Sequence, residues 1–358
     1  MRTSRLLGAR RSFARALFYL LLSLWLVPAR AEQLPPLPVA HSNNAVAKLE
    51  RDGRVRFYSF MGLTAGKTYA DISRQAFEYD VATKRWRRLP DVPVAKGRLA
   101  STAVGVGNLV YLFGGYTVSA DGTEVSTPEV FAFDPRTNGY VARKQMPVPV
   151  DDTVAVPFRE RYIYLISGWH DKDNVRLVQV YDTIEDRWFR ASDWPGLPVF
   201  GHAGGILDNR MVIADGVTVL PGQAGSSRFK LIGDAWLGEI DVADPTRITW
   251  KRLPNHPGNP LYRMAAVGAR RARGVVFAGG SETAYNYNGN GYDGTPATPS
   301  ARNFAFDFHR GKWIDWGSKR PPSMDHRGLL EASGVYYTLG GMGRQRQVIG
   351  DIMPSTRP

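Results

Sequence analysis

Two residues that can exchange protons stand just after short apolar runs that end in glycine. Glu282 follows the pair Gly279-Gly280 at a distance of two residues, and His170 follows Ser167-Gly168-Trp169. A carboxylate and an imidazole on one rim can work as base and acid in proton transfer. We therefore take Glu282 and His170 as the catalytic candidates. The alternative is that each forms hydrogen bonds only within its own loop.

Cationic side chains occupy a second set of comparable positions, near the start of short apolar segments. These are Arg98, His202, Arg263, His326 and Arg327, with Arg228 added by a polar insert. Clustered cations in a region of low dielectric favour a carboxylate or another anion. The alternative for each is a satisfied surface or capping charge.

The insert 281–300 interleaves tyrosine, asparagine and glycine. Tyr285 and Tyr287 lie within it, and Tyr116 occupies the matching place after Gly114-Gly115. Aromatic rings cover the apolar face of a sugar, and amides match its hydroxyls. The insert is therefore a candidate carbohydrate surface, and a solvated, turn-rich loop is the alternative.

A repeated pattern must position these residues. An apolar run ending in glycine recurs six times, as in Val110–Gly115 and Val275–Gly280, and a run ending in aspartate follows, as in Val130–Asp134. A later aromatic residue (Trp86, Tyr140, Trp188, Trp250 or Trp313) stands six residues past the aspartate in four of five units. Short runs rich in β-branched and aromatic residues predict strands, and a period of about 50 to 60 residues suits four-stranded propeller blades.

These motifs resemble the kelch repeat across nearly all of the chain after residue 31. The resemblance implies an all-β fold, a six-bladed propeller with blades that begin near His41, Arg98, Asp151, Gly201, Tyr262 and His326. Residues 32–40 match the end of an outermost strand, as in Arg88-Leu89-Pro90, although no blade precedes them. We therefore expect the N-terminal segment to complete the last blade and close the ring, with proline tolerated at this sheet edge.

The longest spacings between glycine and the later aromatic are 34 residues (Gly216 to Trp250) and 33 residues (Gly280 to Trp313). The extra length follows the glycines, in the loop between the second and third strands. Long loops on a rigid frame usually carry function, so we expect a ligand site on that face, at the mouth of the central channel.

The composition restricts the class of protein. The 358 residues are 43% apolar, lack cysteine and carry a net charge of +13. Without the six arginines of residues 1–31 the remainder carries +7, with no long basic run, so nucleic acid is not an expected partner. The absence of cysteine excludes disulfides and thiolate metal sites, and we expect neither a metal nor a cofactor.

Residues 1–31 have the features of a secretory signal peptide. The arginine-rich start is followed by the apolar stretch 16–27 and by Ala29-Arg30-Ala31, a small-x-small cleavage pattern. Arg10-Arg11 also resembles a twin-arginine signal. We expect residues 32–358 to form the mature propeller, periplasmic or secreted and free of the membrane; an uncleaved anchor is the alternative.

The export signal, ring closure and inserts resemble those of the N-acetylneuraminate epimerase (sialic acid mutarotase) family, which interconverts sugar anomers without a cofactor. The family's catalytic glutamate falls at Val217 here, and its arginine is matched nearest by Arg228. The resemblance leaves Glu282 or Asp215 to substitute for that glutamate. Galactose oxidase, a more distant kelch relative, needs a Tyr–Cys cofactor that this chain cannot form, so it is no copper radical oxidase.

Two functions remain open at this stage. The first is an exported propeller that binds an anionic carbohydrate at its channel mouth and acts as a sugar epimerase or mutarotase. The second is a non-catalytic propeller that binds a protein partner at the cell envelope.

Overall fold

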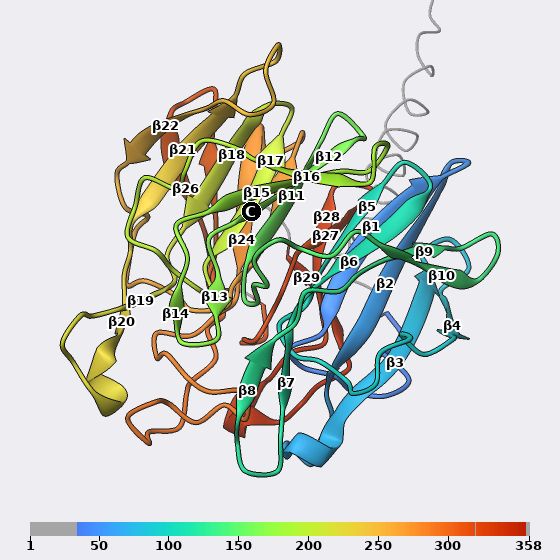
Figure 1. Ribbon diagram of the computed structural model, residues 1–358, viewed down its shortest axis with the longest axis horizontal. Coiled ribbons are helices and arrows are strands. Elements are labelled where there is room, and N and C mark those ends of the chain that lie inside the picture. The colour runs from blue at the N-terminus through green and yellow to red at the C-terminus, as the bar shows by residue number, and fades with distance from the viewer. Residues whose placement is uncertain (1–33, 319, 356–358) are drawn as a thin grey trace, which may run out of the picture. The chain divides into compact units, whose positions relative to one another are not determined.

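The computed structural model describes residues 34–318 and 320–355, which belong to one compact unit that begins at Leu34. The predicted signal peptide and its cleavage site lie outside the described residues. Six sheets are arranged around a common axis (Figure 1). The all-β, six-bladed propeller predicted from the sequence is confirmed. No helix in the described part of the chain is long and apolar enough to cross a bilayer.

Each of the first five blades has four antiparallel strands, ordered from the axis outward. Blade 1 consists of β1 (Ala45–Arg51), β2 (Arg54–Leu63), β3 (Ile72–Asp80) and β4 (Arg85–Leu89). Blade 2 consists of β5 (Thr102–Val106), β6 (Leu109–Phe113), β9 (Val130–Asp134) and β10 (Gly139–Arg143). Blade 3 consists of β11 (Val154–Phe158), β12 (Tyr162–Ile166), β15 (Val178–Asp182) and β16 (Arg187–Arg190).

Blades 4 to 6 continue the same order. Blade 4 consists of β17 (Ala203–Leu207), β18 (Arg210–Ala214), β21 (Ala235–Ile240) and β22 (Ile248–Leu253). Blade 5 consists of β23 (Ala265–Ala269), β24 (Gly274–Ala278), β25 (Asn303–Asp307) and β26 (Lys312–Gly317). Blade 6 shows three strands, β27 (Leu330–Ala332), β28 (Val335–Leu339) and β29 (Ile352–Ser355). The innermost strands contact one another in cyclic order, and β27 contacts β1.

The connections between second and third strands carry further elements. Three short hairpins are β7 (Tyr116–Val118) with β8 (Glu124–Ser126), β13 (Trp169–His170) with β14 (Asp173–Asn174), and β19 (Val217–Val219) with β20 (Phe229–Leu231). Three 3-10 helices are η1 (Tyr69–Asp71), η2 (Gly225–Arg228) and η3 (Arg344–Arg346). The hairpins extend from the same, lower side of the view in Figure 1. We call this side the loop face.

Each second strand has a glycine at or just after its end, paired with a second one in blades 2, 5 and 6, and these glycines turn the chain onto the loop face. Gly114 and Gly115 both have positive φ, 49° and 87°. A Cβ on Gly115 would lie 2.6 Å from the carbonyl oxygen of Leu99, so only glycine fits there. The turn predicted from these glycines is therefore confirmed.

The spaced aromatic residue ties blades 2, 3 and 5 to the blade before them by a hydrogen bond, whereas Trp250 Nε1 of blade 4 is buried without a partner. Trp188 Nε1 donates to the carbonyl oxygen of Lys144 at 2.9 Å, and Trp313 Nε1 donates to that of Pro254 at 2.7 Å. In both cases the acceptor follows the outermost strand of the preceding blade. Each of these repeats therefore contains the strands of a blade and also the aromatic side chain whose hydrogen bond orients that blade against its neighbour.

The N-terminal segment lies where ring closure predicts. Trp86 Nε1 of blade 1 donates to the carbonyl oxygen of Pro35 at 2.9 Å, so Pro35 takes the place that Pro254 takes for Trp313. The backbone N–H of Leu37 donates to the carbonyl oxygen of Gly350 in blade 6 at 2.7 Å. Residues 34–40 thus occupy the position that follows an outermost strand without forming a strand, and blade 6 has three strands in the described part of the chain, so the predicted N-terminal strand is not found there.

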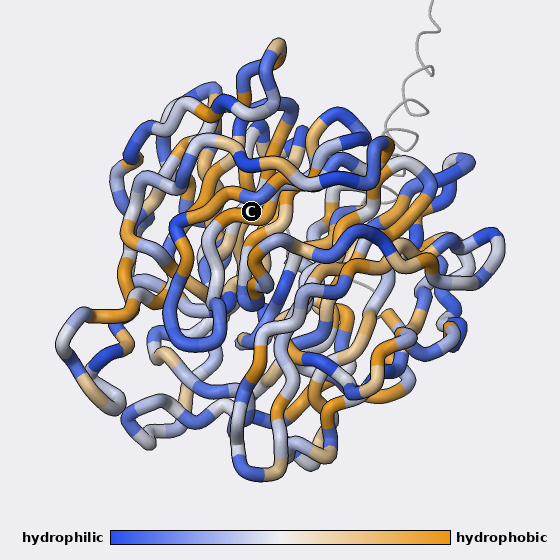
Figure 2. The backbone as a smooth tube through the Cα atoms, in the orientation of Figure 1, coloured by the Kyte–Doolittle hydropathy of each residue, from blue (hydrophilic) through white to orange (hydrophobic). Residues whose placement is uncertain are grey.

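Hydrophobic segments follow the strands, and hydrophilic ones the turns (Figure 2). The core is divided among the interfaces between neighbouring blades, such as the cluster that joins Phe60 of blade 1 to Phe133 of blade 2. A separate cluster lies under the loop face and includes Tyr116, Phe200, Tyr262 and Tyr285. The loops are therefore a packed layer on the propeller rather than free appendages.

Candidate functional site

Six residues that precede the innermost strands form a ring around the axis, which we call the central ring. All six have left-handed backbones, with φ between 48° and 69°: Asn43, Ala100, Asp152, Gly201, Arg263 and Asp325. The backbone N–H groups of Asp152, Gly201 and Arg263 each donate to the carbonyl oxygen of the preceding member. Five non-glycine residues in this sparsely populated conformation indicate a site held by its surroundings.

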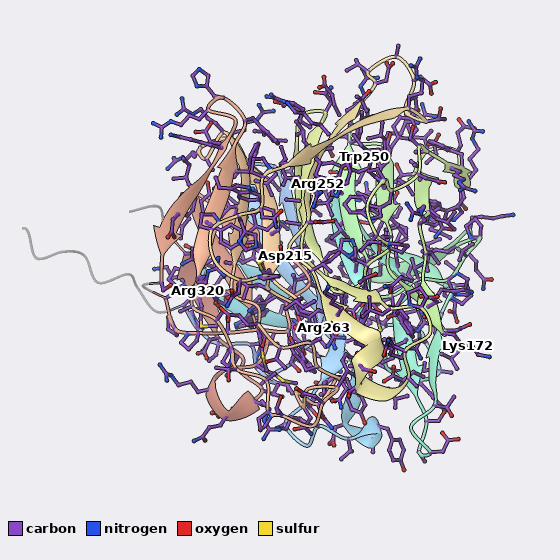
Figure 3. All side chains as sticks on the ribbon, turned by 90° about the vertical axis from the view of Figure 1, so that its left-hand side faces the viewer. Lys172, Asp215, Trp250, Arg252, Arg263 and Arg320 are labelled. Atoms are coloured by element: carbon purple, nitrogen blue, oxygen red, sulfur yellow. The ribbon has the colours of Figure 1, made fainter. Side chains whose placement is uncertain are left out.

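The side chains of the central ring close the channel with paired charges. Arg263 donates from Nε and Nη2 to Asp152, at 3.2 and 2.5 Å, and from Nη1 to Asp325 at 3.0 Å. Arg327 lies 2.8 Å from Asp152 and also donates to Asn43. Burial opposes ionisation of Asp152, but Arg263 and Arg327 hold its pKa below the usual value. Figure 3 shows Arg263 inside the body of the propeller, with Lys172 at its edge.

A small pocket of about 70 Å³ lies on the loop-face side of this ring, and we call it the loop-face pocket. Six aromatic side chains line it: Tyr116, Trp169, Phe200, Phe229, Tyr287 and Tyr292. Its polar lining comes from Glu124, Asp151, Asp152, Arg263 and Asn286. Blades 2 to 5 all contribute, so the propeller assembles this pocket from distant parts of the chain.

Two carboxyl groups of the pocket have elevated proton affinity. Burial raises the pKa of Asp151 well above its ordinary value, and the adjacent Asp152 carboxylate raises it further. Asp151 is 2% exposed, and its Oδ2 accepts a hydrogen bond of 2.6 Å from Ser126 Oγ. Glu124 stands on β8 and is exposed as a residue, but its carboxyl group faces the other pocket side chains, and burial there raises its pKa to about 7. A group that titrates near neutral pH can both take and give a proton.

The tyrosines of this region are proton donors. Burial raises the pKa values of Tyr116, Tyr262 and Tyr285 well above that of free tyrosine, so they stay protonated. The hydroxyls of Tyr262 and Tyr285 are buried without a hydrogen-bond partner. Tyr292 stacks on Phe229 with ring centroids 4.1 Å apart, which fixes one wall.

The structure brings together part of the set predicted from the sequence. Tyr116, Arg263 and Tyr287 line the loop-face pocket. Tyr285 lies beneath it, fully buried, with its ring 5.2 Å from the Arg263 guanidinium. Arg228 lies over the rings of Trp169 and Phe229, at 5.8 and 5.1 Å, and donates to the carbonyl oxygen of Lys172.

Three of the four predicted arginines, Arg98, Arg263 and Arg327, are paired with carboxylates rather than free at the mouth. The fourth, Arg228, lies over the aromatic rings. Arg98 is buried and ion-paired with Glu129 at 2.8 Å. Arg263 and Arg327 are neutralised within the central ring, as described above. The acidic partner of Arg98 comes from its own blade, whereas Arg263 and Arg327 pair with Asp152 of blade 3.

Two predicted histidines lie on the other side of the central ring, where a second cavity of about 240 Å³ follows the innermost strands. His202 Nε2 donates to the carbonyl oxygen of Ile166 at 2.8 Å, and His326 is hydrogen-bonded to Ser323. Burial lowers the pKa of both rings, to about 4 for His202. Neither histidine is a cation at neutral pH.

The two catalytic candidates are not part of the loop-face pocket. Glu282 is exposed and accepts a hydrogen bond of 2.8 Å from Asn259. His170 lies beside Asp171, with Nδ1 4.0 Å from its carboxylate. Asp215, named as a substitute, is buried and paired with His256 at 2.8 Å. The catalytic roles of Glu282 and His170 stay predictions, whereas Glu124 and Asp151 are the carboxyl groups with raised pKa that line the pocket.

Glu124 and Asp151 were missed because their importance depends on packing. Glu124 looks like any charged residue of a polar hairpin, and Asp151 was noted only as the start of a blade. The adjacent pair Asp151-Asp152 at an inner-strand start is the one signal in the sequence. Within residues 34–318 and 320–355, no group of three acidic or histidine side chains is arranged to hold a metal ion.

Comparisons with known proteins agree with this architecture. No protein-family model matches the chain. It is 33% identical to Kelch-like protein 15 of Gallus gallus over 129 residues, 36% of this chain and 25% of that protein. It is 26% identical to Kelch-like protein terF of Aspergillus terreus over 188 residues, 51% of this chain and 39% of that protein. The matches thus span about a quarter to two-fifths of these relatives.

A solved structure titled "Structure of YjhT" superimposes with a TM-score of 0.71 at 16% identity, covering 90% of this chain and 97% of the other. At that identity the likeness concerns the fold. The chain is a six-bladed propeller of the kelch type, with sequence similarity to Kelch-like proteins.

Proposed function

We propose that this protein is an exported propeller that binds a carbohydrate in the loop-face pocket. One observation carries the proposal: six aromatic side chains surround three carboxyl groups where four blades meet. Aromatic faces cover the C–H face of a sugar, while carboxyl and tyrosine hydroxyl groups bond its hydroxyls. The 3-D likeness to YjhT supports the frame on which such a site is built.

Ligand-observed NMR with a panel of monosaccharides tests binding. We expect Tyr287→Ala and Phe229→Ala to weaken the signal at least about tenfold, since each removes a ring from the pocket wall. Tyr69→Ala is the matched control, because Tyr69 is 48% exposed and lies outside the pocket. An equal loss of the NMR binding signal in all three variants would count against the proposal, and so would the absence of binding to any sugar.

The same pocket supports catalysis of anomer exchange as part of this proposal. Opening a sugar ring requires removal of the anomeric hydroxyl proton and delivery of a proton to the ring oxygen. Glu124, with a pKa of about 7, suits both roles in turn, because it can take the hydroxyl proton and return a proton to the ring oxygen. Exchange NMR should show anomer interconversion above the spontaneous rate, lost in Glu124→Gln. Exchange at the spontaneous rate would leave a binding protein.

Export is the remaining part of the proposal. It depends on the sequence pattern of residues 1–31, and it assigns the mature chain to the periplasm or to the secreted fraction. Mass spectrometry of the mature protein should give Glu32 as its first residue. An intact Met1 on protein recovered from the membrane fraction would favour the uncleaved anchor.

A protein-binding propeller is the second candidate, favoured by the similarity to Kelch-like proteins. Two exposed apolar residues lie in loop-face connections of neighbouring blades, Tyr69 in η1 and Val125 in β8, both 48% exposed. Exposed apolar side chains of this kind suit a protein contact. In that case Val125→Asp should abolish capture of the partner while leaving sugar binding unchanged.

A further inference from the structure

We infer that the loop-face pocket selects a ligand that carries a protonated amino group, and that its sugar is an amino sugar with a free amine. The amine part is argued from the pocket itself, and the sugar part rests on the proposed function above. The sequence led to the opposite expectation, an acidic sugar held by arginines.

The charge of the pocket favours a cation. Three carboxyl groups line it, from Glu124, Asp151 and Asp152, against one guanidinium, that of Arg263. All three nitrogens of that guanidinium already bond to Asp152 or Asp325. These bonds use three of the five N–H donors, and the two carboxylates balance the charge of Arg263, so a ligand carboxylate would meet an already paired cation and two further carboxyl groups. An ammonium group would instead find unused acceptors.

The aromatic walls favour the same sign of charge. The faces of aromatic rings are negative and attract a cation within about 6 Å. Aromatic rings at this site already hold the cationic groups of two arginines. Arg228 lies over Trp169 and Phe229 at the rim. At the base, the Arg263 guanidinium lies 4.8 Å from the ring centre of Tyr262 and 5.2 Å from that of Tyr285. Tyr287 and Tyr292 add two further rings to the pocket lining.

Asp151 provides the second, independent observation. Its side chain is 98% buried and lines the pocket, yet the hydrogen bond it accepts from Ser126 engages one oxygen, Oδ2. Burying a carboxyl group this completely is costly unless a partner satisfies it. Burial also keeps it protonated in the empty pocket, and an ammonium group nearby would favour its ionised form.

The volume sets the size of the recognised group. A cavity of about 70 Å³ accepts one substituent, such as an ammonium group, rather than a whole sugar ring. The ring would then lie above the cavity, among the hairpins of the loop face. Discrimination between sugars should accordingly depend most on the substituent that enters the pocket.

Titration calorimetry near pH 7 tests the inference with glucosamine, galactosamine, glucose, glucuronic acid and methylammonium as probes. We expect an amino sugar to bind at least about tenfold more tightly than glucose, and glucuronic acid to bind most weakly. Glucose binding as tightly as the amino sugars would overturn the inference but keep the proposed function. Methylammonium binding as tightly as the amino sugars would keep the inference and overturn the carbohydrate proposal. If glucuronic acid bound most tightly, the inference would be overturned. If none of the probes bound, both the inference and the carbohydrate proposal would be overturned.

Three variants separate a charge effect from a structural one. Asp151→Asn and Glu124→Gln keep the shape of the side chain but cannot carry negative charge, and each should weaken amino-sugar binding about tenfold and glucose binding by a smaller factor. Glu185→Gln is the matched control: its side chain is 54% exposed, outside the pocket, and it should change neither. Equal weakening of amino-sugar and glucose binding in the pocket variants would contradict selection by charge.

Discussion

Arg263 and Asp152 form a doubly hydrogen-bonded ion pair across the axis of the propeller, with distances of 3.2 Å (Nε–Oδ1) and 2.5 Å (Nη2–Oδ2). The two residues come from blades 5 and 3, and both side chains are 2% exposed. Their backbones are left-handed at equivalent positions of the repeat. The pair therefore joins blades that are not neighbours and separates the loop-face pocket from the cavity behind it.

Removing the arginine should destabilise the whole propeller. We expect Arg263→Met to lower the free energy of unfolding by about 3 to 5 kcal/mol, because it leaves Asp152 and Asp325 buried without their main partner. Urea unfolding followed by tryptophan fluorescence measures the change.

Arg270→Met is the control for this variant. Arg270 pairs with Asp208 at 2.9 Å, but the two side chains are 81% and 56% exposed, so its loss should cost less than about 1 kcal/mol. Similar values for the two variants would show that the central pair is not a buried, structural one.

The sequence predicted the frame because the frame is local and repeated. Two consecutive glycines such as Gly114-Gly115, an aspartate and a spaced aromatic lie within one repeat, and each has a fixed structural task. Ring closure was predictable for the same reason, since Pro35 occupies a position that Pro90 and Pro254 occupy in complete blades.

The site could not be predicted to the same extent, because it depends on contacts between repeats. Asp152 and Arg263 are 111 residues apart, and one sequence gives no sign that they neutralise each other. Insert length pointed to the face on which the loop-face pocket lies. It could not show that Tyr287 turns into the pocket whereas Glu282 stays exposed, since that depends on how the insert packs against blades 2 to 4.

Leu37 should contribute to ring closure. It is 4% exposed and packs with Phe57 of blade 1 and Leu330 and Ile352 of blade 6. Leu37→Ala should lower the free energy of unfolding by about 2 to 4 kcal/mol, because it leaves a cavity between the first and last blades. Thermal unfolding compared with Leu197→Ala, where the leucine is 50% exposed, provides the measurement and its control. A change no larger than that of the control would argue against closure through this segment.

Buried histidines should make the propeller sensitive to acid. Burial lowers the pKa of His41 and His202 to about 4, so both rings stay neutral in the fold while the unfolded chain binds protons below about 6.5. The unfolded state thus takes up more protons, and stability should fall between pH 6.5 and 4, by on the order of 3 kcal/mol for each histidine.

His202→Gln isolates this effect, because its amide can still donate to the carbonyl oxygen of Ile166. The variant should lose less stability than the parent between pH 7 and pH 4.5 in urea unfolding. Buried acids with a raised pKa, such as Asp151, stabilise the fold as the pH falls. Both proteins contain these acids, so their contribution cancels when the two stability profiles are subtracted. Parallel pH profiles would contradict the assignment.

Close packing of the innermost strands should make Gly268 irreplaceable. A Cβ at Gly268 in β23 would lie 1.6 Å from the carbonyl oxygen of Ile206 in β17, where the acceptor is backbone and cannot move aside. Gly268→Ala should therefore cost at least about 3 kcal/mol, at the upper end for overpacking. Gly139→Ala in β10 is the matched control, since its nearest neighbour would be 3.7 Å away, and it should be neutral or slightly stabilising. If Gly268→Ala unfolded at the same urea concentration as Gly139→Ala, blades 4 and 5 could not approach each other this closely around the channel.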